Sequence, residues 1–199
     1  MLKSAFEAHV PCQWVTGDEI YGNNRKLRRW LEKNRHAYVL GIASNQYVWW
    51  WNYRQLHVSK LLSEIATNEW ERISVGAGSK GERVYDWGQV RLPPIGPDIP
   101  EGLGRWLLVR RSIGHPEEIA YFLGFGHERT SLQELAEVAG KRWGIEAAFE
   151  EAKGEAGLDE YEVRKWDNWY RHITLSLLAH AYLVVKSIAG KDKKGATRV

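Results

Sequence analysis

A strand–helix–strand pattern near the amino terminus constrains the fold more than any other feature of this sequence. Residues 13–19 and 37–43 are two short apolar runs typical of strands. Between them, apolar residues recur at helical spacing behind Asn24, a residue type that caps helix starts. An amphipathic crossover of this kind joins two parallel neighbouring strands. The pattern therefore predicts an α/β fold.

The sequence changes character after the second predicted strand. Residues 46–125 combine aromatic and apolar runs with turns rich in glycine and proline, which is typical of antiparallel strands. The last third of the sequence is helical. We therefore expect a core at 1–45, a β-rich insertion at 46–128, a helical part of the core at 129–190 and a basic tail at 191–199.

Two long helical runs fill the last third. The first begins with Ser131 and has Glu134 three residues on, a capping-box pattern. Gly140 and Gly144 interrupt this run, so that it fits either one helix or two. The second run ends at Gly190, and its charge-free stretch is shorter than a membrane-spanning segment, which predicts a buried helix.

Charge is distributed unevenly, although the formal net charge is only +3. Residues 20–60 hold eight Lys and Arg against Glu32 alone, whereas residues 146–162 hold seven acids against Lys153. A basic face beside an acidic focus fits a metal-using enzyme that acts on a polyanion, and it fits a solvated mixed surface equally well. The single cysteine, Cys12, excludes an internal disulfide and indicates a reducing compartment.

Two carboxylates are candidates for chemistry. Asp18 follows a predicted strand directly, where α/β sheets bind ligands, and it is equally placed to cap the next helix. Glu146 lies between Arg142 and Lys153, and the three positions fall within roughly 40° on one helix face. Such a face can hold a divalent metal and grip phosphates, while Arg142 and Glu146 also fit an ordinary i,i+4 ion pair.

The amino-acid sequence around Asp18 and around Glu146 resembles that of the DDE-superfamily transposases of bacterial insertion sequences. The region of their second aspartate is similar to WVTGDEIYG followed by LRRWLEKNRHAYVLGIASN, and their glutamate helix is similar to RWGIEAAFEEAKGEAGLDEYEVRKWDNWYRHITLSLLAHAYL. Arg142, Glu146 and Lys153 match the Arg-x3-Glu-x6-Lys pattern of the insertion-sequence-four-like subgroup, whereas Ala139 departs from its tyrosine. YDWGQVRL and RWLLVRRS resemble the insertion region of this family, so the resemblance covers nearly the whole chain.

The resemblance implies a partial RNase H-like catalytic core interrupted by a mostly antiparallel β insertion. In such a core, three carboxylates hold two Mg²⁺ or Mn²⁺ ions that activate water or a 3′-hydroxyl for attack on a DNA phosphodiester. Asp18 and Glu146 would be the second and third catalytic acids and metal ligands, and Arg142 and Lys153 would contact DNA phosphates. The implied partners are DNA, as transposon end and as target, and a second copy or a full-length transposase. The implied location is the bacterial cytoplasm, at the nucleoid, without a membrane.

Further DNA contacts are expected from the basic region and its aromatic neighbours. Arg28, Arg29 and Arg54 belong to the basic segment. Trp50, beside Arg54, can stack an unpaired base, as the resemblance implies. Alternatively, Trp49 and Trp51 pack on one face of the insertion while Trp50 faces the other.

The first aspartate of the family has no counterpart before Asp18, because the one upstream acid is Glu7. The chain therefore resembles the C-terminal portion of a transposase, and we expect the isolated chain not to cleave DNA. An inactive regulator that binds DNA or a transposase is the alternative. A carbohydrate enzyme, with tryptophans and paired carboxylates, is a third interpretation.

Overall fold

The computed structural model describes residues 1–78, 81–94 and 99–195, with side chains described up to residue 189. The chain divides into two compact units, Met1–Arg142 and Trp143–Val199. We describe each unit by itself. Residues 95–98, within a turn region rich in glycine and proline, and the end of the expected basic tail, 196–199, lie outside the described residues.

The first unit is built on a mixed sheet, which has six strands in the described part of the chain, in the order β1-β2-β8-β7-β6-β5. The predicted parallel pair is confirmed, because β1 (Trp14–Gly17) runs parallel to β2 (Ala37–Ile42). The remaining neighbours are antiparallel. The other four strands of the sheet are β5 (Glu71–Gly78), β6 (Gly81–Arg91), β7 (Leu103–Arg111) and β8 (Ile119–His127). Since β8 pairs with β2, strands of the middle region extend the same sheet as the first two strands.

Two helices connect β1 with β2. The short α2 (Glu19–Gly22) is followed by α3 (Arg25–Lys33), which is the predicted crossover helix. The Asn24 side chain accepts hydrogen bonds from the backbone N–H groups of Lys26 and Leu27, so the predicted cap is confirmed. The apolar positions of α3, with Leu31 fully buried, lie against the sheet.

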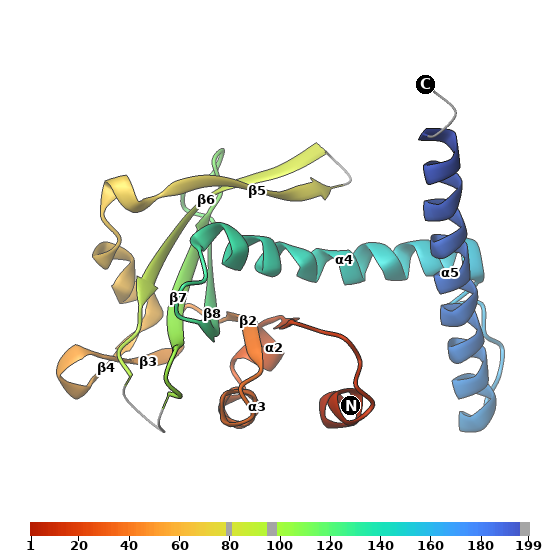
Figure 1. Cartoon of the computed structure of the whole chain (residues 1–199), viewed down its shortest axis with the longest axis horizontal. Coiled ribbons are helices and arrows are strands. Elements are labelled where there is room, and N and C mark those ends of the chain that lie inside the picture. Colours follow the sequence, from red (N-terminus) through yellow and green to blue (C-terminus); the bar gives the residue numbers. More distant parts are fainter. Residues whose placement is uncertain (79–80, 95–98, 196–199) are drawn as a thin grey trace. The chain divides into compact units, whose positions relative to one another are not determined.

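The sheet separates two apolar clusters, because alternate residues of each strand point to opposite faces. One face packs against α3 and the 3₁₀ segment Val58–Glu64; its buried members include Tyr38, Leu40, Leu107, Leu123 and Phe125. The other face packs against the first turns of α4 (Leu132–Ala156), through residues such as Val39, Trp87, Trp106, Leu108 and Leu135. The sheet curls around this part of α4, with β5 and β6 on one side of the helix and β2 on the other (Figure 1).

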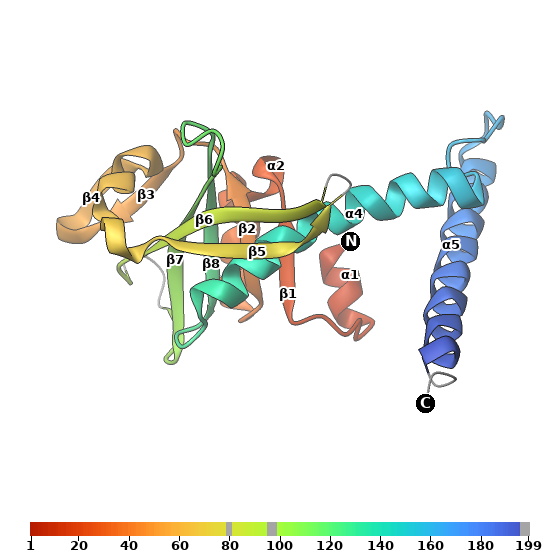
Figure 2. The ribbon, with the colours of Figure 1, turned by 90° about the horizontal axis from the view of Figure 1, so that it is seen from above.

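The helix α4 is continuous across both of its glycines, so the two-helix alternative is wrong. Gly140 lies where α4 crosses β5, and Figure 2 shows β5 and β6 alongside these turns of the helix. A Cβ added at Gly140 would lie 2.5 Å from the Cβ of Val75. This glycine therefore permits the close approach of helix and sheet. The Oγ of Ser131 accepts from the Glu134 N–H at 3.2 Å, which confirms the start of the helix.

The segment before β5 forms a small hairpin of its own. In it, β3 (Tyr47–Trp50) pairs antiparallel with β4 (Arg54–His57), and Trp50 lies opposite Arg54. The strand ends at Trp50, and the turn that follows has positive φ angles of 60° at Asn52 and 55° at Tyr53. Trp51 therefore leaves the strand and is 53% exposed, so the predicted packing of Trp49 and Trp51 on one strand face is wrong.

The described part of the second unit contains the end of α4 and the helix α5 (Trp166–Gly195). Ala152 of α4 and Ser176 and His180 of α5 are buried, and the Nε2 of His180 lies 4.0 Å from the Oε2 of Glu151 on α4. The backbone stays helical past Gly190, so the predicted helix end is wrong.

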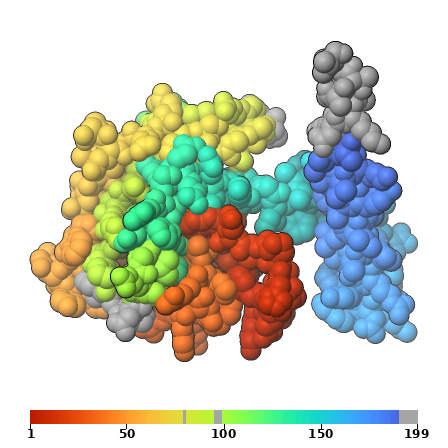
Figure 3. Space-filling model, viewed as in Figure 1, coloured from red at the N-terminus to blue at the C-terminus, as the bar shows by residue number. Residues whose placement is uncertain are grey.

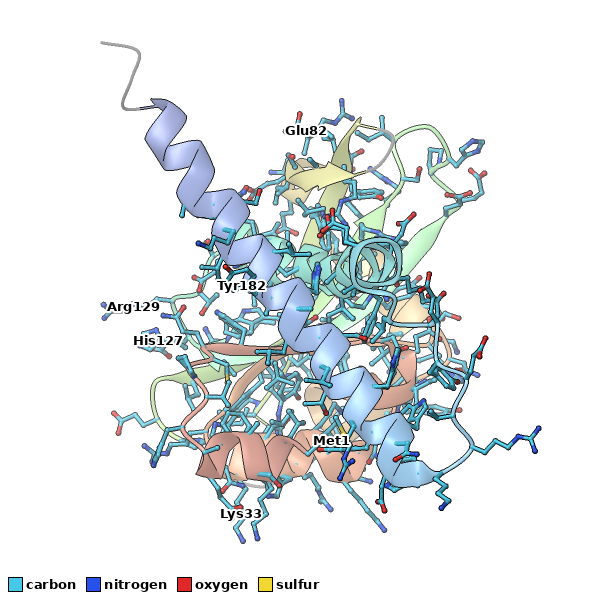
Figure 4. All side chains as sticks on the ribbon, turned by 90° about the vertical axis from the view of Figure 1, so that its right-hand side faces the viewer. Met1, Lys33, Glu82, His127, Arg129 and Tyr182 are labelled. Atoms are coloured by element: carbon cyan, nitrogen blue, oxygen red, sulfur yellow. The ribbon has the colours of Figure 1, made fainter. Side chains whose placement is uncertain are left out.

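The apolar surface of α5 extends beyond its contact with α4. Leu175, Leu178 and Tyr182 are 60% or more exposed, and Figure 4 shows Tyr182 on the surface of the helix. The second unit alone therefore does not bury this helix, contrary to the expectation, because only one flank of α5 faces α4. Trp166–Ala189 is long and apolar enough to cross a membrane, a test that the core helix of a soluble protein also passes.

Candidate functional site

Asp18 lies between β1 and α2, so its predicted position after a strand and its predicted role as a helix cap are both confirmed. It follows the last residue of the strand, and its Oδ1 accepts a hydrogen bond of 3.0 Å from the Ile20 N–H, which caps α2. The side chain is half-buried, so it retains access to solvent. A carboxylate at the carboxyl end of a parallel strand is well placed for a ligand in an α/β sheet.

Two glycines hold this corner of the sheet together. A Cβ added at Gly22 would lie 1.7 Å from the carbonyl oxygen of Gly41, so α2 rests directly on β2. The Oδ1 of Asn23 accepts from the Ala43 N–H at 3.2 Å and ties the end of α2 to the end of β2. The position of Asp18 relative to the sheet is therefore fixed by backbone packing on the residues just after it.

Glu146 lies on the part of α4 that belongs to the second unit, and its side chain is exposed. Arg142, Glu146 and Lys153 all fall within the one helix Leu132–Ala156, as the sequence predicts. Within either unit, the described residues bring no three His, Cys, Asp or Glu side chains together. The chemistry of Asp18 and Glu146 still suits a hard divalent ion, because both are carboxylates with access to solvent.

The acid of the basic segment, Glu32, is the centre of a hydrogen-bonded network. Arg105 binds it with two nitrogens, Nε to Oε1 at 3.0 Å and Nη2 to Oε2 at 2.6 Å. The Tyr38 hydroxyl donates to Oε1 at 2.7 Å. Burial, together with the charge and the hydrogen bond of Glu32, raises the pKa of Tyr38 well above its ordinary value. Tyr38 therefore stays protonated and remains a donor to the carboxylate.

Arg28 is buried between α3 and α2. Its Nη1 donates a hydrogen bond to the carbonyl oxygen of Gly22, the last residue of α2. Burial lowers the pKa of its guanidinium, whereas the negative charge of Glu32 acts in the opposite direction. Arginine stays protonated near neutral pH, so this is a buried positive charge next to the helix that Asp18 caps.

A cavity of about 200 Å³ lies between α3 and the β3–β4 hairpin. Its wall includes Arg25, Arg28, Arg29, Arg105, Tyr47 and Trp49. Glu32 also lines it, so four guanidinium groups and one carboxylate give its wall a net charge of +3. Arg105 comes from β7, and the other residues come from α3 (dark orange) and the hairpin (orange), which lie on the side of the first unit away from β5 (yellow) (Figure 3).

The cavity brings together only part of the predicted DNA contacts. Arg28 and Arg29 line it, whereas Trp50 packs partly against the apolar core and Arg54 is exposed at the start of β4. Arg105 and Trp49 also line the cavity and were not predicted as site residues from the sequence. For Arg105, the one signal was Glu32, a lone acid in a basic run that needed a cationic partner once buried.

Comparison with known proteins gives one family. The family model described as Transposase DDE domain matches residues 2–182 of the 199, a range that includes both Asp18 and Glu146. No curated protein matches the chain.

Proposed function

This chain belongs to the family of transposases with a DDE domain, and from that premise we propose that its residues serve metal-dependent cleavage and strand transfer of DNA in the intact enzyme. Transposases bind DNA, and their DDE domains generally use divalent metal ions. A transposase is expected in the cytoplasm, and we propose that this one associates with the nucleoid. The observation that carries the proposal is the family match, which spans both candidate carboxylates.

In this proposal, Asp18 and Glu146 are the catalytic carboxylates and hold Mg²⁺ or Mn²⁺. When bound, such an ion would activate a water or a 3′-hydroxyl and would stabilise negative charge on the phosphate that is attacked. Arg142 and Lys153 bind backbone phosphates on either side of Glu146 along α4 and so orient the DNA strand. Their Arg-x3-Glu-x6-Lys spacing supports membership of the insertion-sequence-four-like subgroup.

The remaining assignments concern DNA and protein partners. We propose that Arg28, Arg29 and Arg54 contact DNA phosphates and that Trp50 stacks a base. The partners are transposon ends, target DNA and a second copy or a full-length transposase. The segments 1–45 and 129–190 would form the RNase H-like core, 46–128 the insertion and 191–199 a basic tail.

An inactive regulator that binds DNA or a transposase is the second candidate. It is supported by the four arginines of the cavity wall, which favour an anion such as a DNA phosphate whether or not the chain is catalytically active. The carbohydrate interpretation gains no support, because a cavity wall with four arginines favours an anion over a neutral sugar.

DNA binding with a strong dependence on salt is the first test of this function. If about four phosphates are contacted, the affinity for duplex DNA should fall roughly a hundredfold between 50 and 200 mM salt, because bound counterions are released. Fluorescence anisotropy of a labelled duplex at several salt concentrations measures this slope. A protein that fails to bind DNA, but whose tryptophan fluorescence responds to a neutral oligosaccharide, would contradict the proposal.

A further inference from the structure

We propose that the cavity between α3 and the β3–β4 hairpin binds the phosphate group of a nucleotide. The proposal rests on the function proposed above, because DNA is the expected source of such a phosphate. It goes further by assigning a defined site, with Arg25 and Arg105 in its wall, to one chemical group.

The positive charges in the cavity wall favour the binding of an anion. Arg28 is 9% exposed, and its hydrogen-bond partner is the neutral carbonyl of Gly22. A buried charge is costly unless an opposite charge compensates for it. Arg25 and Arg29 lie one turn apart on α3, and neither forms an ion pair with the described residues. A phosphate between these three groups would supply the missing counter-charge.

The carboxylate in the wall does not oppose an anion. Both oxygens of Glu32 accept hydrogen bonds from Arg105, and one of them accepts a further bond from Tyr38. The side chains of Arg105 and Glu32 are 16% and 11% exposed, so this pair is held rigidly between the sheet and α3. Its charges cancel, and the arginines of α3 give the cavity its positive potential.

The volume of the cavity and the other residues of its wall favour a nucleotide phosphate over a larger ligand. The volume, about 200 Å³, is below that of pockets for drug-sized molecules, so it admits one phosphate-bearing unit. Guanidinium groups bind phosphate oxygens in pairs of parallel hydrogen bonds. Tyr47 and Trp49 form an aromatic wall on the hairpin side, against which a sugar or base can rest. Because Arg28 also holds Gly22, the site adjoins the helix that Asp18 caps.

Two double variants of the full chain test the site with equal changes in charge. Arg25→Gln with Arg29→Gln removes two arginines from the cavity wall. Lys26→Gln with Lys33→Gln removes two charges from the same helix outside the cavity, and Figure 4 shows Lys33 on α3, pointing away from the sheet. All four side chains are exposed, and a thermal melt checks that both variants are folded.

We expect the arginine variant to bind a labelled single-stranded oligonucleotide at least about tenfold more weakly than the parent, with a salt slope lower by about two. The lysine variant should lose less than about threefold. Competition with 5′-dAMP distinguishes the sources of the phosphate. If 5′-dAMP displaces the oligonucleotide, the site accepts a free nucleotide; if it does not, the site is specific for a backbone phosphate.

Equal losses in the two double variants, or no loss in either, would overturn the assignment while leaving DNA binding intact. Failure of the parent chain to bind DNA would instead count against the proposed function. In that case, calorimetry with 5′-dAMP tests the cavity alone. Binding that is lost in the arginine variant would support the site, and no binding to the parent would overturn it.

Discussion

Supercoiled plasmid DNA should stay intact when the 199-residue chain is added with Mg²⁺ or Mn²⁺, at protein concentrations at which the chain binds DNA. The proposed centre has Asp18 and Glu146, and the one acid before Asp18 is Glu7 on the exposed surface of α1. Two carboxylates hold a divalent ion weakly and do not form a clamp for two ions. A centre that lacks the second ion loses several kcal/mol of stabilisation of the charged transition state, which lowers the rate of DNA cleavage at least about a thousandfold.

Nicking is measured by the conversion of supercoiled to relaxed plasmid on an agarose gel. The background level of nicking is measured with the Asp18→Ala variant and with a reaction that contains a chelator in place of the metal. Efficient nicking that requires Mg²⁺ and disappears in Asp18→Ala would show that these residues already contain a complete centre. It would also exclude the inactive regulator.

Replacing Glu32 by Gln should lower the free energy of unfolding by about 3 kcal/mol. The substitution removes the negative charge that pairs with Arg105 between the sheet and α3, and breaking a buried pair in this way costs about 3–5 kcal/mol. The pair here is slightly exposed, at 16% and 11% for the two side chains, so the lower end is expected. Tyr38→Phe, which removes one hydrogen bond to the same carboxylate, should cost about 1 kcal/mol.

Urea unfolding followed by tryptophan fluorescence measures these differences. Glu7→Gln is the matched control, because it removes the same charge from the exposed pair with Lys3 and should change stability by less than about 1 kcal/mol. We infer that the hydrogen bonds of Glu32 with Arg105 and Tyr38 stabilise the wall of the cavity. If Glu32→Gln were no more destabilising than Glu7→Gln, this inference would be wrong.

The local elements of the first unit could be predicted because their signals lie within a few residues. The strand β1, the capped helix α3 and the strand β2 each carry an apolar pattern, and Asn24 marks the helix start. The pairing of β8 with β2 joins residues some eighty positions apart and leaves no local pattern. Likewise, α4 continues through Gly140, where it packs against Val75, a residue of β5 that is far from Gly140 in the sequence.

The same distinction separates the predicted from the missed parts of the candidate site. Asp18 could be found because a strand and a cap are both local features. Arg105 meets Glu32 from 73 residues away, so no spacing rule points to it. Trp49 instead of Trp50 reaches the cavity because alternate residues of β3 point to opposite sides, and Trp50 lies on the side that packs against the apolar core.

Asp18 and Glu146 are proposed to be metal ligands, and Mn²⁺ binding tests this most directly. Loss of the free-ion signal in electron paramagnetic resonance measures binding to the full chain. Asp18→Asn and Glu146→Gln should each weaken it at least about tenfold, as removal of even an outer partner of a metal ligand does. The exposed neighbours provide controls, and Glu19→Gln and Glu150→Gln should leave binding unchanged. A double variant, Asp18→Asn with Glu146→Gln, that bound Mn²⁺ as tightly as the parent chain would contradict the proposed metal centre.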